Sequence, residues 1–386
     1  MQLTSTIQAI HEKPDSGVLI MTGGGSLLLS TLMTEPGASN TVLHAEIPYS
    51  AAALNNVLGY VPKSSASAVV ARQLAITAYE RGLGLDPKTP DACFGLGISC
   101  ALATKRARKG DDRAFIAIHS QRETRLTEIT FSPIGDTSAE SSSEPSRRQY
   151  QETALMNVAL ELLCGYLDLD FPYSPTTSDF ELEHHRAEAD PAWRPVIAKT
   201  RKATPTELRA PALFPGAFNP VHEGHLKMKG IAETLIEKPV HFELSVKNVD
   251  KPSLDYLDLQ QRVSLLAPHG DVVLTNAPTF LEKAELYPGT TFVVGIDTLI
   301  RIENPKYYSS IADRDAAVAR LIALDSTFIV FGRYYNGTYQ HLDNAGLTTA
   351  LKSQCSMVPE STFRQDISST DIRAQKARDT QTRDAL

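Results

Sequence analysis

The stretch GAFNPVHEGH, residues Gly216–His225, decides the fold of the C-terminal half. It follows the apolar run Ala212–Phe214, which predicts a short buried strand, and it precedes Leu226–Lys229, which predicts the first turn of a helix. A helix N-terminus presents unpaired backbone N–H groups and a partial positive charge, so it attracts phosphate. His222 and His225 lie at this helix start, where their ring N–H groups can donate hydrogen bonds to phosphoryl oxygens. The stretch therefore predicts a strand, a tight loop and a helix that together hold phosphate.

A second short stretch, ISSTDIR at residues 367–373, carries three hydroxyl groups and an arginine. Ser368, Ser369 and Thr370 are suited to cap the helix that follows, and their hydroxyl and N–H groups can also hold phosphate. Arg373 is expected about one helical turn further along. A serine-rich helix start is typical of an ordinary cap, so this stretch points to phosphate only in combination with the first one.

The C-terminal half alternates between strand-like and helix-like segments. Amphipathic segments predict helices at Leu257–Leu266 and Asp313–Leu324, and such alternation predicts a parallel sheet with helices on both faces, a Rossmann-like α/β fold. Ligands of these sheets bind beyond the carboxyl ends of the strands. Gly295, Asp297 and Arg333 each follow a predicted strand, so we expect them in one crevice with the first stretch. The predicted strands are Ala212–Phe214, Val240–Val246, Val272–Thr275, Thr291–Gly295 and Thr327–Phe331.

Together these motifs resemble those of the HxGH nucleotidyltransferase superfamily. Gly216–His225 is similar to its first signature, and ISSTDIR is similar to its second, ISSTxxR, in the order and separation that the family shows. The form GxFNPxHxGH is most similar to nicotinamide and nicotinate mononucleotide adenylyltransferases. FVVGIDTLIRI, around Asp297, resembles the GxDxL strand end of the family, and Arg333 resembles an arginine that follows a late strand. The resemblance covers about 180 residues at the C-terminal end, roughly one domain.

The resemblance implies adenylyl transfer, in which the phosphate of a pyridine mononucleotide attacks the α-phosphorus of ATP and pyrophosphate leaves. It implies that His222 and His225 contact the α- and β-phosphates, and that Arg373 holds the leaving pyrophosphate. We expect Mg²⁺ to arrive with ATP and to have few protein ligands, so no residue is predicted to bind a metal. The implied phosphate-binding residues are Gly216, Ala217, Phe218, Asn219, Ser368, Ser369 and Thr370, and the implied nucleotide pocket is formed by Gly295, Asp297, Arg333, Lys247 and Asn248.

Two alternatives stay open from the sequence. The first is another nucleotidyltransferase of the superfamily, which uses CTP or a different phosphorylated acceptor. The second is a nucleotide-binding regulatory or scaffold protein with weak ATPase activity. The sequence also does not distinguish the amide from the acid form of the pyridine mononucleotide, because that choice depends on one contact in the pocket.

The first half also has an α/β pattern, and it carries a glycine-rich turn. TGGGS, residues Thr22–Ser26, follows the predicted strand Gly17–Met21 and begins the predicted helix Ser26–Met33, so it can cradle phosphate. A triple-glycine turn is a weak signal on its own. The other predicted elements are strands at Val42–Ile47, Cys93–Ser99, Ala114–His119 and Leu126–Phe131 and long helices at Ser67–Arg81 and Gln149–Leu167.

TGGGSLLLSTLMTEPGASN, followed by EIPYS, resembles the C-terminal domain of CinA, the family of nicotinamide mononucleotide deamidases, over roughly the first 165 residues, about one domain. The sequence departs from the family at its chemistry, since Thr22 replaces the serine of AESCTGG and Leu54 replaces the partner lysine. Without an amine to activate it, a hydroxyl is a poor nucleophile. We therefore expect a degenerate site that comprises Thr22, Gly23, Gly24, Gly25 and Ser26. We also expect this domain to assemble a homo-oligomer.

A chain of 386 residues suggests two domains. We predict a CinA-like domain at residues 1–170, a linker at 171–208 that is rich in proline and charge, and a nucleotidyltransferase domain at 209–386. The net charge of −7 argues against general nucleic-acid binding, which needs clustered Lys and Arg. The expected partners are small-molecule nucleotides.

The cysteines and the hydropathy indicate the cellular compartment. The four cysteines form no CxxC pair and no zinc spacing, which is typical of reduced thiols in an intracellular protein. No apolar stretch approaches the about 20 residues that span a bilayer, and the N-terminus lacks a secretory signal. We therefore expect a soluble cytoplasmic protein without membrane partners, and the sequence leaves a nuclear pool open.

Overall fold

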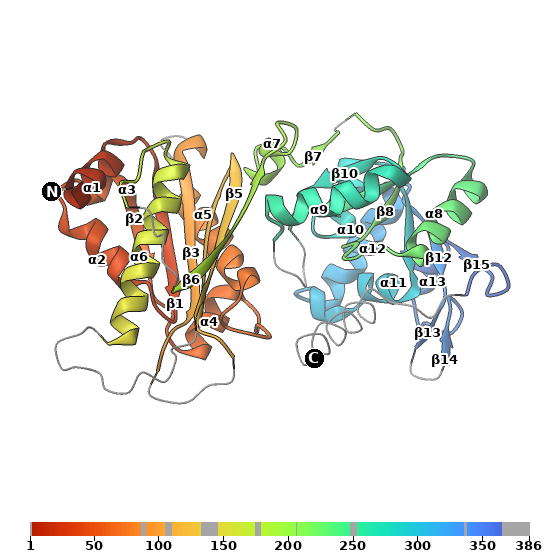
Figure 1. The fold of residues 1–386 in the computed structure, drawn as a ribbon. Coiled ribbons are helices and arrows are strands. Elements are labelled where there is room, and N and C mark those ends of the chain that lie inside the picture. The colour runs from red at the N-terminus through yellow and green to blue at the C-terminus, as the bar shows by residue number, and fades with distance from the viewer. Residues whose placement is uncertain are drawn as a thin grey trace. The chain divides into compact units, whose positions relative to one another are not determined.

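A computed structural model describes residues 2–85, 90–104, 110–132, 146–173, 179–205, 207–247, 253–335 and 338–364 (Figure 1). The chain divides into two compact units. Unit 1 comprises Met1–Asp190 with Asp255–Leu257, and unit 2 comprises Pro191–Leu254 with Asp258–Leu386. Each unit is built around its own central sheet.

The sheet of unit 1 is mixed and has the strand order β2-β1-β3-β4-β5-β6. Strand β1 pairs parallel to β2 and β3, whereas the remaining neighbours pair antiparallel. Strand β3 is buried along almost its whole length, because helices cover both faces of the sheet and water reaches neither. The strands are β1 (Ser16–Thr22), β2 (Val42–Glu46), β3 (Cys93–Ala101), β4 (Arg113–Ser120), β5 (Glu123–Phe131) and β6 (Phe180–Glu188).

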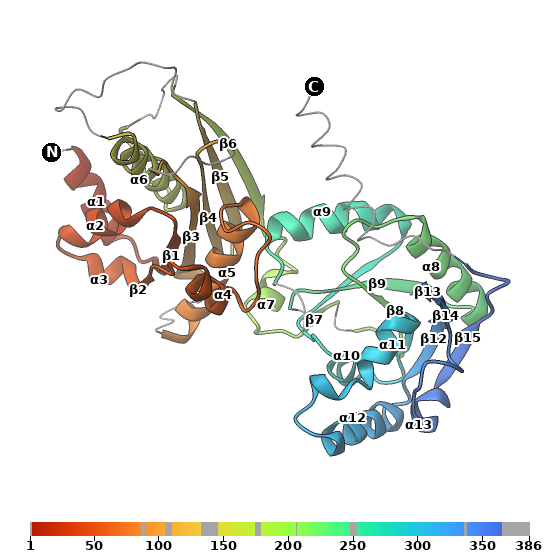
Figure 2. The same cartoon turned by 90° about the horizontal axis from the view of Figure 1, so that it is seen from below.

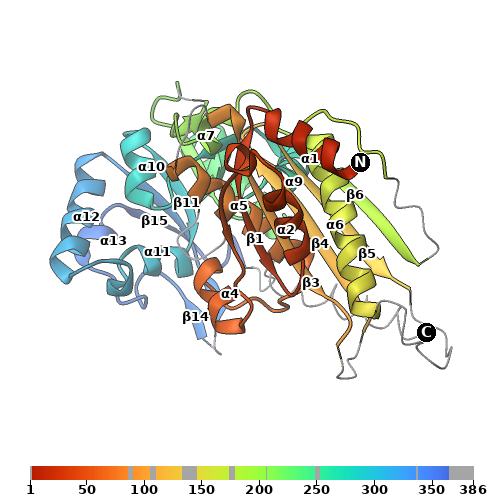
Figure 3. The ribbon, with the colours of Figure 1, turned by 90° about the vertical axis from the view of Figure 1, so that its left-hand side faces the viewer.

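Helices cover both faces of this sheet. Figures 1 and 3 show α1, α2 and α6 on one side and α4 and α5 on the other. The first layer buries residues such as Ile7, Leu28 and Leu155, and the second buries Leu54 and Leu74. The helices are α1 (Gln2–Glu12), α2 (Ser26–Thr34), α3 (Ala38–Thr41), α4 (Ala51–Leu58), α5 (Ala68–Leu85) and α6 (Arg147–Tyr166), and a short 3-10 turn η1 lies at Pro90–Ala92.

The prediction of a linker over residues 171–208 is wrong for its central part, which forms strand β6. This strand lies inside that range, and it pairs antiparallel with β5 from Phe180 to Glu188 as the edge of the first sheet. Its sequence, FELEHHRAE, alternates only weakly because an edge strand exposes most of its side chains to water. This weak alternation is typical of a polar linker, although the segment completes the sheet of unit 1.

The sheet of unit 2 has the order β15-β12-β11-β8-β9-β10-β7 and is parallel except for β7, which pairs antiparallel with β10. The predicted parallel α/β sheet is thus present. From β8 the chain first adds strands on one side and then on the other, so the strand order reverses beside β8. The strands are β7 (Ala203–Thr204), β8 (Ala212–Pro215), β9 (Val240–Ser245), β10 (Val272–Thr275), β11 (Thr291–Gly295), β12 (Thr327–Phe331) and β15 (Cys355–Val358), with a separate hairpin of β13 (Arg333–Tyr335) and β14 (Thr338–Gln340).

Helices also cover both faces of the second sheet. Figure 2 shows α8 and α9 on one side and α10, α11 and α12 on the other. The core of the latter side joins buried residues such as Leu213, Phe292, Leu299 and Leu321. The helices are α7 (Arg194–Ile197), α8 (Glu223–Ile236), α9 (Tyr256–Leu266), α10 (Phe280–Leu286), α11 (Ile296–Ile302), α12 (Ile311–Ala323) and α13 (Thr349–Lys352), with 3-10 turns η2 (Ala267–His269) and η3 (Pro305–Tyr307).

Within the described residues, the predicted strands and helices are present within a few residues of their expected bounds, whereas the helix predicted after Thr370 lies outside them. The elements that were not predicted include the strands β6, β7 and β15 at or near the sheet edges, the hairpin β13–β14, and the helices α1, α3, α4, α7, α10, α11 and α13. Among the described residues, no helix combines the length and the apolar character needed to cross a membrane.

Candidate functional site

A cavity of about 740 Å³ lies in unit 2, at the carboxyl ends of the central strands. Residues at the ends of β8, β9, β11 and β12 line it, and so do parts of α8, α10, α11 and α12. This is the edge where the strand order reverses, and ligands of open α/β sheets bind at such a switch point. Nine of the predicted site residues line the cavity, namely Gly216, Ala217, Phe218, Asn219, His222, His225, Gly295, Asp297 and Arg333.

The loop between β8 and α8 is held by hydrogen bonds at its start. The N–H of Gly216 donates to the carbonyl oxygen of Glu243 at 3.1 Å, so the loop leaves the sheet bound to β9. The guanidinium of Arg262, on α9, donates to the carbonyl oxygen of Ala217 at 3.0 Å. Arg262 is largely buried and also lies 3.7 Å from Asp258. The loop is therefore fixed before any ligand arrives.

Gly216 is required by the aromatic ring beside it. Phe218 has a left-handed backbone conformation with φ of 44°, and its side chain is only 2% exposed. A Cβ on Gly216 would lie 2.6 Å from Cζ of that ring, much closer than carbon atoms approach. The ring in turn packs against His225, with ring centroids 5.1 Å apart and the planes at 73°. Gly216 thus makes room for the ring that supports His225.

The two histidines form one unit at the start of α8. Their rings stack with centroids 3.7 Å apart, and the backbone N–H of His222 donates to Nδ1 of His225 at 3.2 Å. Because Nδ1 of His225 accepts a hydrogen bond, the neutral ring carries its proton on Nε2, which is then a donor. Nδ1 of His222 is buried and has no hydrogen-bond partner among the described residues, so Nε2 is the ring nitrogen left to meet a ligand.

Burial keeps both histidines neutral. Desolvation, with a smaller contribution from His222, lowers the pKa of His225 from 6.5 to about 3. Desolvation also lowers the pKa of His222, and the nearby positive charge of Arg333 adds to that effect. At neutral pH the site therefore offers two uncharged N–H donors beside an arginine and a helix N-terminus.

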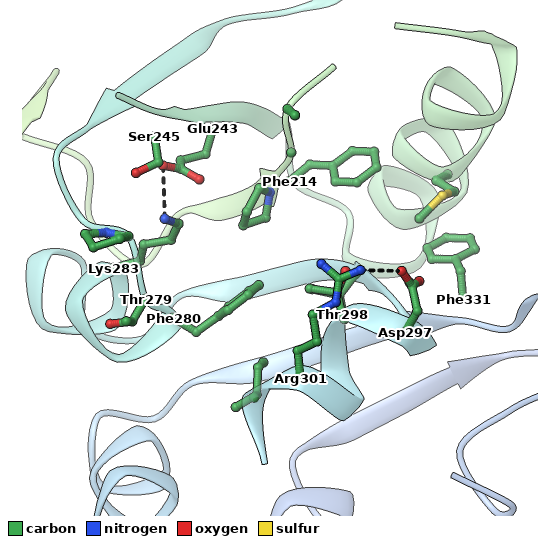
Figure 4. Close-up of a pocket in the computed structure, with 18 of the residues that line it drawn as sticks. Phe214, Glu243, Ser245, Thr279, Phe280, Lys283, Asp297, Thr298, Arg301 and Phe331 are labelled. Atoms are coloured by element: carbon green, nitrogen blue, oxygen red, sulfur yellow. Dashed lines mark hydrogen bonds and ion pairs between the residues drawn. The ribbon is translucent and has the colours of Figure 1, made fainter. Parts of the chain in front are cut away.

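Asp297 lies between two arginines on another wall of the cavity. Its carboxylate is 3.5 Å from Arg301, one turn along α11 (Figure 4). It is also 3.9 Å from Arg333, at the start of β13. All three side chains are more than a third exposed, so these contacts contribute little to stability. Their charges remain available to an entering ligand. Arg301 was not among the predicted site residues, although its i, i+4 spacing from Asp297 indicates the pairing.

A second polar cluster, formed by Glu243, Lys283 and Thr275, was also missed from the sequence. Glu243 lies on β9 and Lys283 on α10, and both line the cavity although they are 1% and 3% exposed. Figure 4 shows them with Ser245 at the end of the cavity away from Asp297. In the sequence, Glu243 is the one acidic residue of the β9 segment VHFELS, whereas Lys283 lies among other charged residues in FLEKAEL and is not distinguished from them.

The remaining predicted residues of this half do not line the cavity or are not described. Lys247 is exposed, and its carbonyl oxygen accepts a hydrogen bond from Ser245 at 2.5 Å. Asn248 and the second stretch, with Ser368, Ser369, Thr370 and Arg373, lie outside the described residues. Within the described ranges, no group of three or more His, Cys, Asp or Glu side chains is arranged to hold a metal ion.

The glycine-rich turn of unit 1 is filled by the chain's own side chains. The N–H of Gly25, which leads into α2 at Ser26, donates to Glu152 at 2.8 Å, and Arg148 donates to the carbonyl oxygen of Gly23 at 2.6 Å. Glu152 thus takes the place that a phosphate occupies at a free helix start. Gly24 packs closely enough that a Cβ there would lie 2.9 Å from the Glu152 carboxylate.

The predicted nucleophile position of unit 1 is likewise engaged. The hydroxyl of Thr22 donates to the carbonyl oxygen of Pro48 at 2.8 Å, and the residue is buried. Leu54, which stands where the lysine is expected, is 2% exposed and packs in the core between the sheet and α5. The degenerate-site residues thus lie together at one turn, but their polar groups bind to the protein itself.

Residues 213–375 match the family described as Cytidylyltransferase-like. The N-terminal half is similar to solved structures of CinA competence-damage proteins. The competence/damage inducible protein CihA of Agrobacterium tumefaciens is 17% identical, with a TM-score of 0.33, over 43% of this chain and 95% of that one. A competence or damage-inducible protein of Enterobacter asburiae is 17% identical, with a TM-score of 0.32, over 42% and 95%. No curated protein sequence matches the chain.

Proposed function

We propose that the Cytidylyltransferase-like domain at residues 213–375 transfers the adenylyl group of ATP to nicotinamide or nicotinate mononucleotide, giving a dinucleotide and pyrophosphate. The family match supports nucleotidyltransferase activity with a nucleoside triphosphate. The choice of ATP and of a pyridine mononucleotide is our inference from the FNP form of the first stretch.

The observation that carries the proposal is the pair of stacked histidines at the N-terminus of α8. His222 and His225 line the cavity, are held neutral by burial, and sit where the helix dipole is positive. Neutral N–H donors at a helix start suit phosphoryl oxygens, because the negative charge on these oxygens grows as the leaving group departs. Arg333 and Arg301 also line the cavity and add positive charge.

The reaction needs no nucleophile from the protein. A phosphate oxygen of the mononucleotide attacks the α-phosphorus of ATP in line, a P–O bond forms, and the bond to the β-phosphate oxygen breaks. The attacking phosphate is already an anion at neutral pH, so positioning and charge stabilisation account for the rate. We assign the stabilising role to Nε2 of His222 and His225, and we assign the pyrophosphate to Ser369, Thr370 and Arg373. Magnesium is proposed to accompany ATP.

The test is a pyrophosphate-release assay on the full chain with Mg²⁺. Either ATP or CTP is combined with nicotinamide mononucleotide, nicotinate mononucleotide or no acceptor, and the dinucleotide is identified by mass. Acceptor-dependent dinucleotide from ATP supports the proposal. Transfer only from CTP would replace it with the cytidylyl alternative, and ATP hydrolysis without transfer would favour the regulatory alternative.

We infer that unit 1 does not act as an amidase. Three observations support this, since the Thr22 hydroxyl is bound to Pro48, Leu54 is buried in the core, and Glu152 occupies the glycine turn. The test measures ammonia release from nicotinamide mononucleotide by the full chain and by a Thr22→Val variant. Release that is lost in the variant would contradict the inference, whereas release that the variant retains would come from another site. Assembly of a homo-oligomer through unit 1 and a cytoplasmic location remain predictions, and light scattering tests the first.

A further inference from the structure

The cavity has two polar ends of different character. At one end lie His222, Asp297 and the arginines, which suit phosphate. At the other end lie Glu243, Lys283 and Ser245, and Figure 4 shows Phe280 between Lys283 and Arg301. The proposed phosphoryl chemistry uses the first end only. The second end therefore has polar groups without an assigned ligand.

The polar groups of this second end are not fully used within the protein. Thr275 donates to Oε1 of Glu243 at 2.5 Å, and Nζ of Lys283 lies 3.4 Å from the same oxygen. Lys283 also donates to the carbonyl oxygen of Ala277. Both contacts of the carboxylate go to Oε1, so Oε2 has no partner among the described residues. An ammonium has three donors, and two of those of Lys283 are used here.

Glu243 offers Oε2 as an acceptor and Lys283 offers one N–H of Nζ as a donor, at an end of the cavity where both residues are almost fully buried. Burial raises the pKa of the Glu243 carboxyl, and the Lys283 ammonium 3.4 Å away opposes this shift by favouring the charged form. With both groups ionised, the pair is neutral overall. A neutral amide group matches this pattern, because its N–H₂ can donate to Oε2 and its carbonyl oxygen can accept from Nζ. We propose that Glu243 and Lys283 select an acceptor with an uncharged carboxamide over one with a carboxylate. This inference rests on the proposed function and decides between the two pyridine mononucleotides.

A carboxylate in the same place is disfavoured for an electrostatic reason. It would bring a second anion next to Glu243, while Lys283 already neutralises the first one. Like charges are costly where water is excluded, and specificity often comes from such a repulsive element. We therefore expect kcat/KM for nicotinamide mononucleotide to exceed that for nicotinate mononucleotide by at least about tenfold, a difference of about 1.4 kcal/mol in transition-state binding.

The experiment measures kcat/KM for both mononucleotides with the wild-type full chain and with Glu243→Gln. The substitution keeps the shape of the side chain but leaves the Lys283 charge unbalanced, so it should move the ratio towards the acid by about tenfold or more. Lys283→Gln leaves the Glu243 charge unbalanced and should move the ratio the other way. Glu285→Gln, on the exposed side of α10, is the matched control and should leave the ratio unchanged.

Each outcome bears on one proposal. A wild-type enzyme that prefers the acid overturns the carboxamide inference while leaving adenylyl transfer intact, and so does a ratio that Glu243→Gln leaves unchanged. This wild-type comparison holds even if the buried variants fail to fold, which thermal unfolding reveals. Titration calorimetry with each mononucleotide tests the proposed function separately from the carboxamide inference. If the protein binds neither mononucleotide and forms no dinucleotide, the proposed function itself is refuted.

Discussion

Replacing Gly216 with alanine tests how the loop supports His225. The new Cβ would lie 2.6 Å from Cζ and 2.9 Å from both Cε atoms of Phe218, about 1 Å inside normal carbon contact. The ring has no space to retreat, because it packs against Phe214 and Phe242 with centroids 5.3 and 5.1 Å away. The strain must therefore move the loop, the ring, or His225.

We expect two effects of Gly216→Ala. Overpacking of a filled site costs about 1–3 kcal/mol in the free energy of unfolding. A displacement of about 1 Å at a reacting group costs about 100-fold in rate, so kcat/KM for nucleotidyl transfer should fall by about that factor. Steady-state kinetics measure the second effect, and chemical denaturation measures the first.

Gly230→Ala is the control, because Gly230 lies on α8, the helix that carries His225, and a Cβ there meets nothing within 4 Å. Alanine is the better helix residue, so this variant should gain about 0.4–1 kcal/mol of stability and keep its activity. If Gly216→Ala folds as stably as wild type and retains most of its kcat/KM, the argument that Gly216 positions His225 through Phe218 is wrong.

Four further predictions rest on the described contacts. His225→Ala should lower kcat by about 10²–10³-fold with little change in thermal unfolding, and near-normal turnover would remove His225 from the proposed site. Burial holds the pKa of His225 near 3 and that of His222 below 6.5. A plot of kcat/KM against pH should therefore show no titration of a histidine near pH 6.5, and a fall of kcat/KM centred there would contradict the neutral pair. As the pH drops, His225 takes up its proton in the unfolded chain at a higher pH than in the folded protein. The free energy of unfolding should therefore fall between about pH 6.5 and pH 3, and this fall should be smaller in His225→Asn. Glu152→Ala removes the acceptor of the Gly25 N–H and should cost about 0.5–2 kcal/mol in urea unfolding of unit 1, whereas an unchanged midpoint would mean that the turn does not depend on Glu152.

The central elements of both units could be predicted from the sequence. Runs such as Phe292–Gly295 and Phe328–Phe331 are short, apolar and rich in β-branched or aromatic residues, and they end at glycine or a polar loop. Buried parallel strands have this pattern because both faces are covered. The first stretch could be placed for the same reason, since its loop follows such a strand directly.

The missed features depend on contacts that no local pattern contains. The cluster of Glu243 and Lys283 joins β9 to α10, and neither segment indicates the other. The same holds for Glu152, which reaches the glycine turn at Gly25 from α6. The turn itself was visible in the sequence, but only the fold shows that the chain's own carboxylate fills it.

Strand β6 has a consequence for how copies of the chain can associate. It is the outer strand of the first sheet, and its exposed residues include Glu181, Glu183, Arg186 and Glu188. Open sheet edges invite a strand from another molecule, and charged side chains are a common protection against this, since a second β6 would bring glutamates beside glutamates. Self-association by edge-to-edge pairing is therefore disfavoured at β6. An assembly of unit 1 is therefore expected to use a surface other than this edge, such as one of its helical faces.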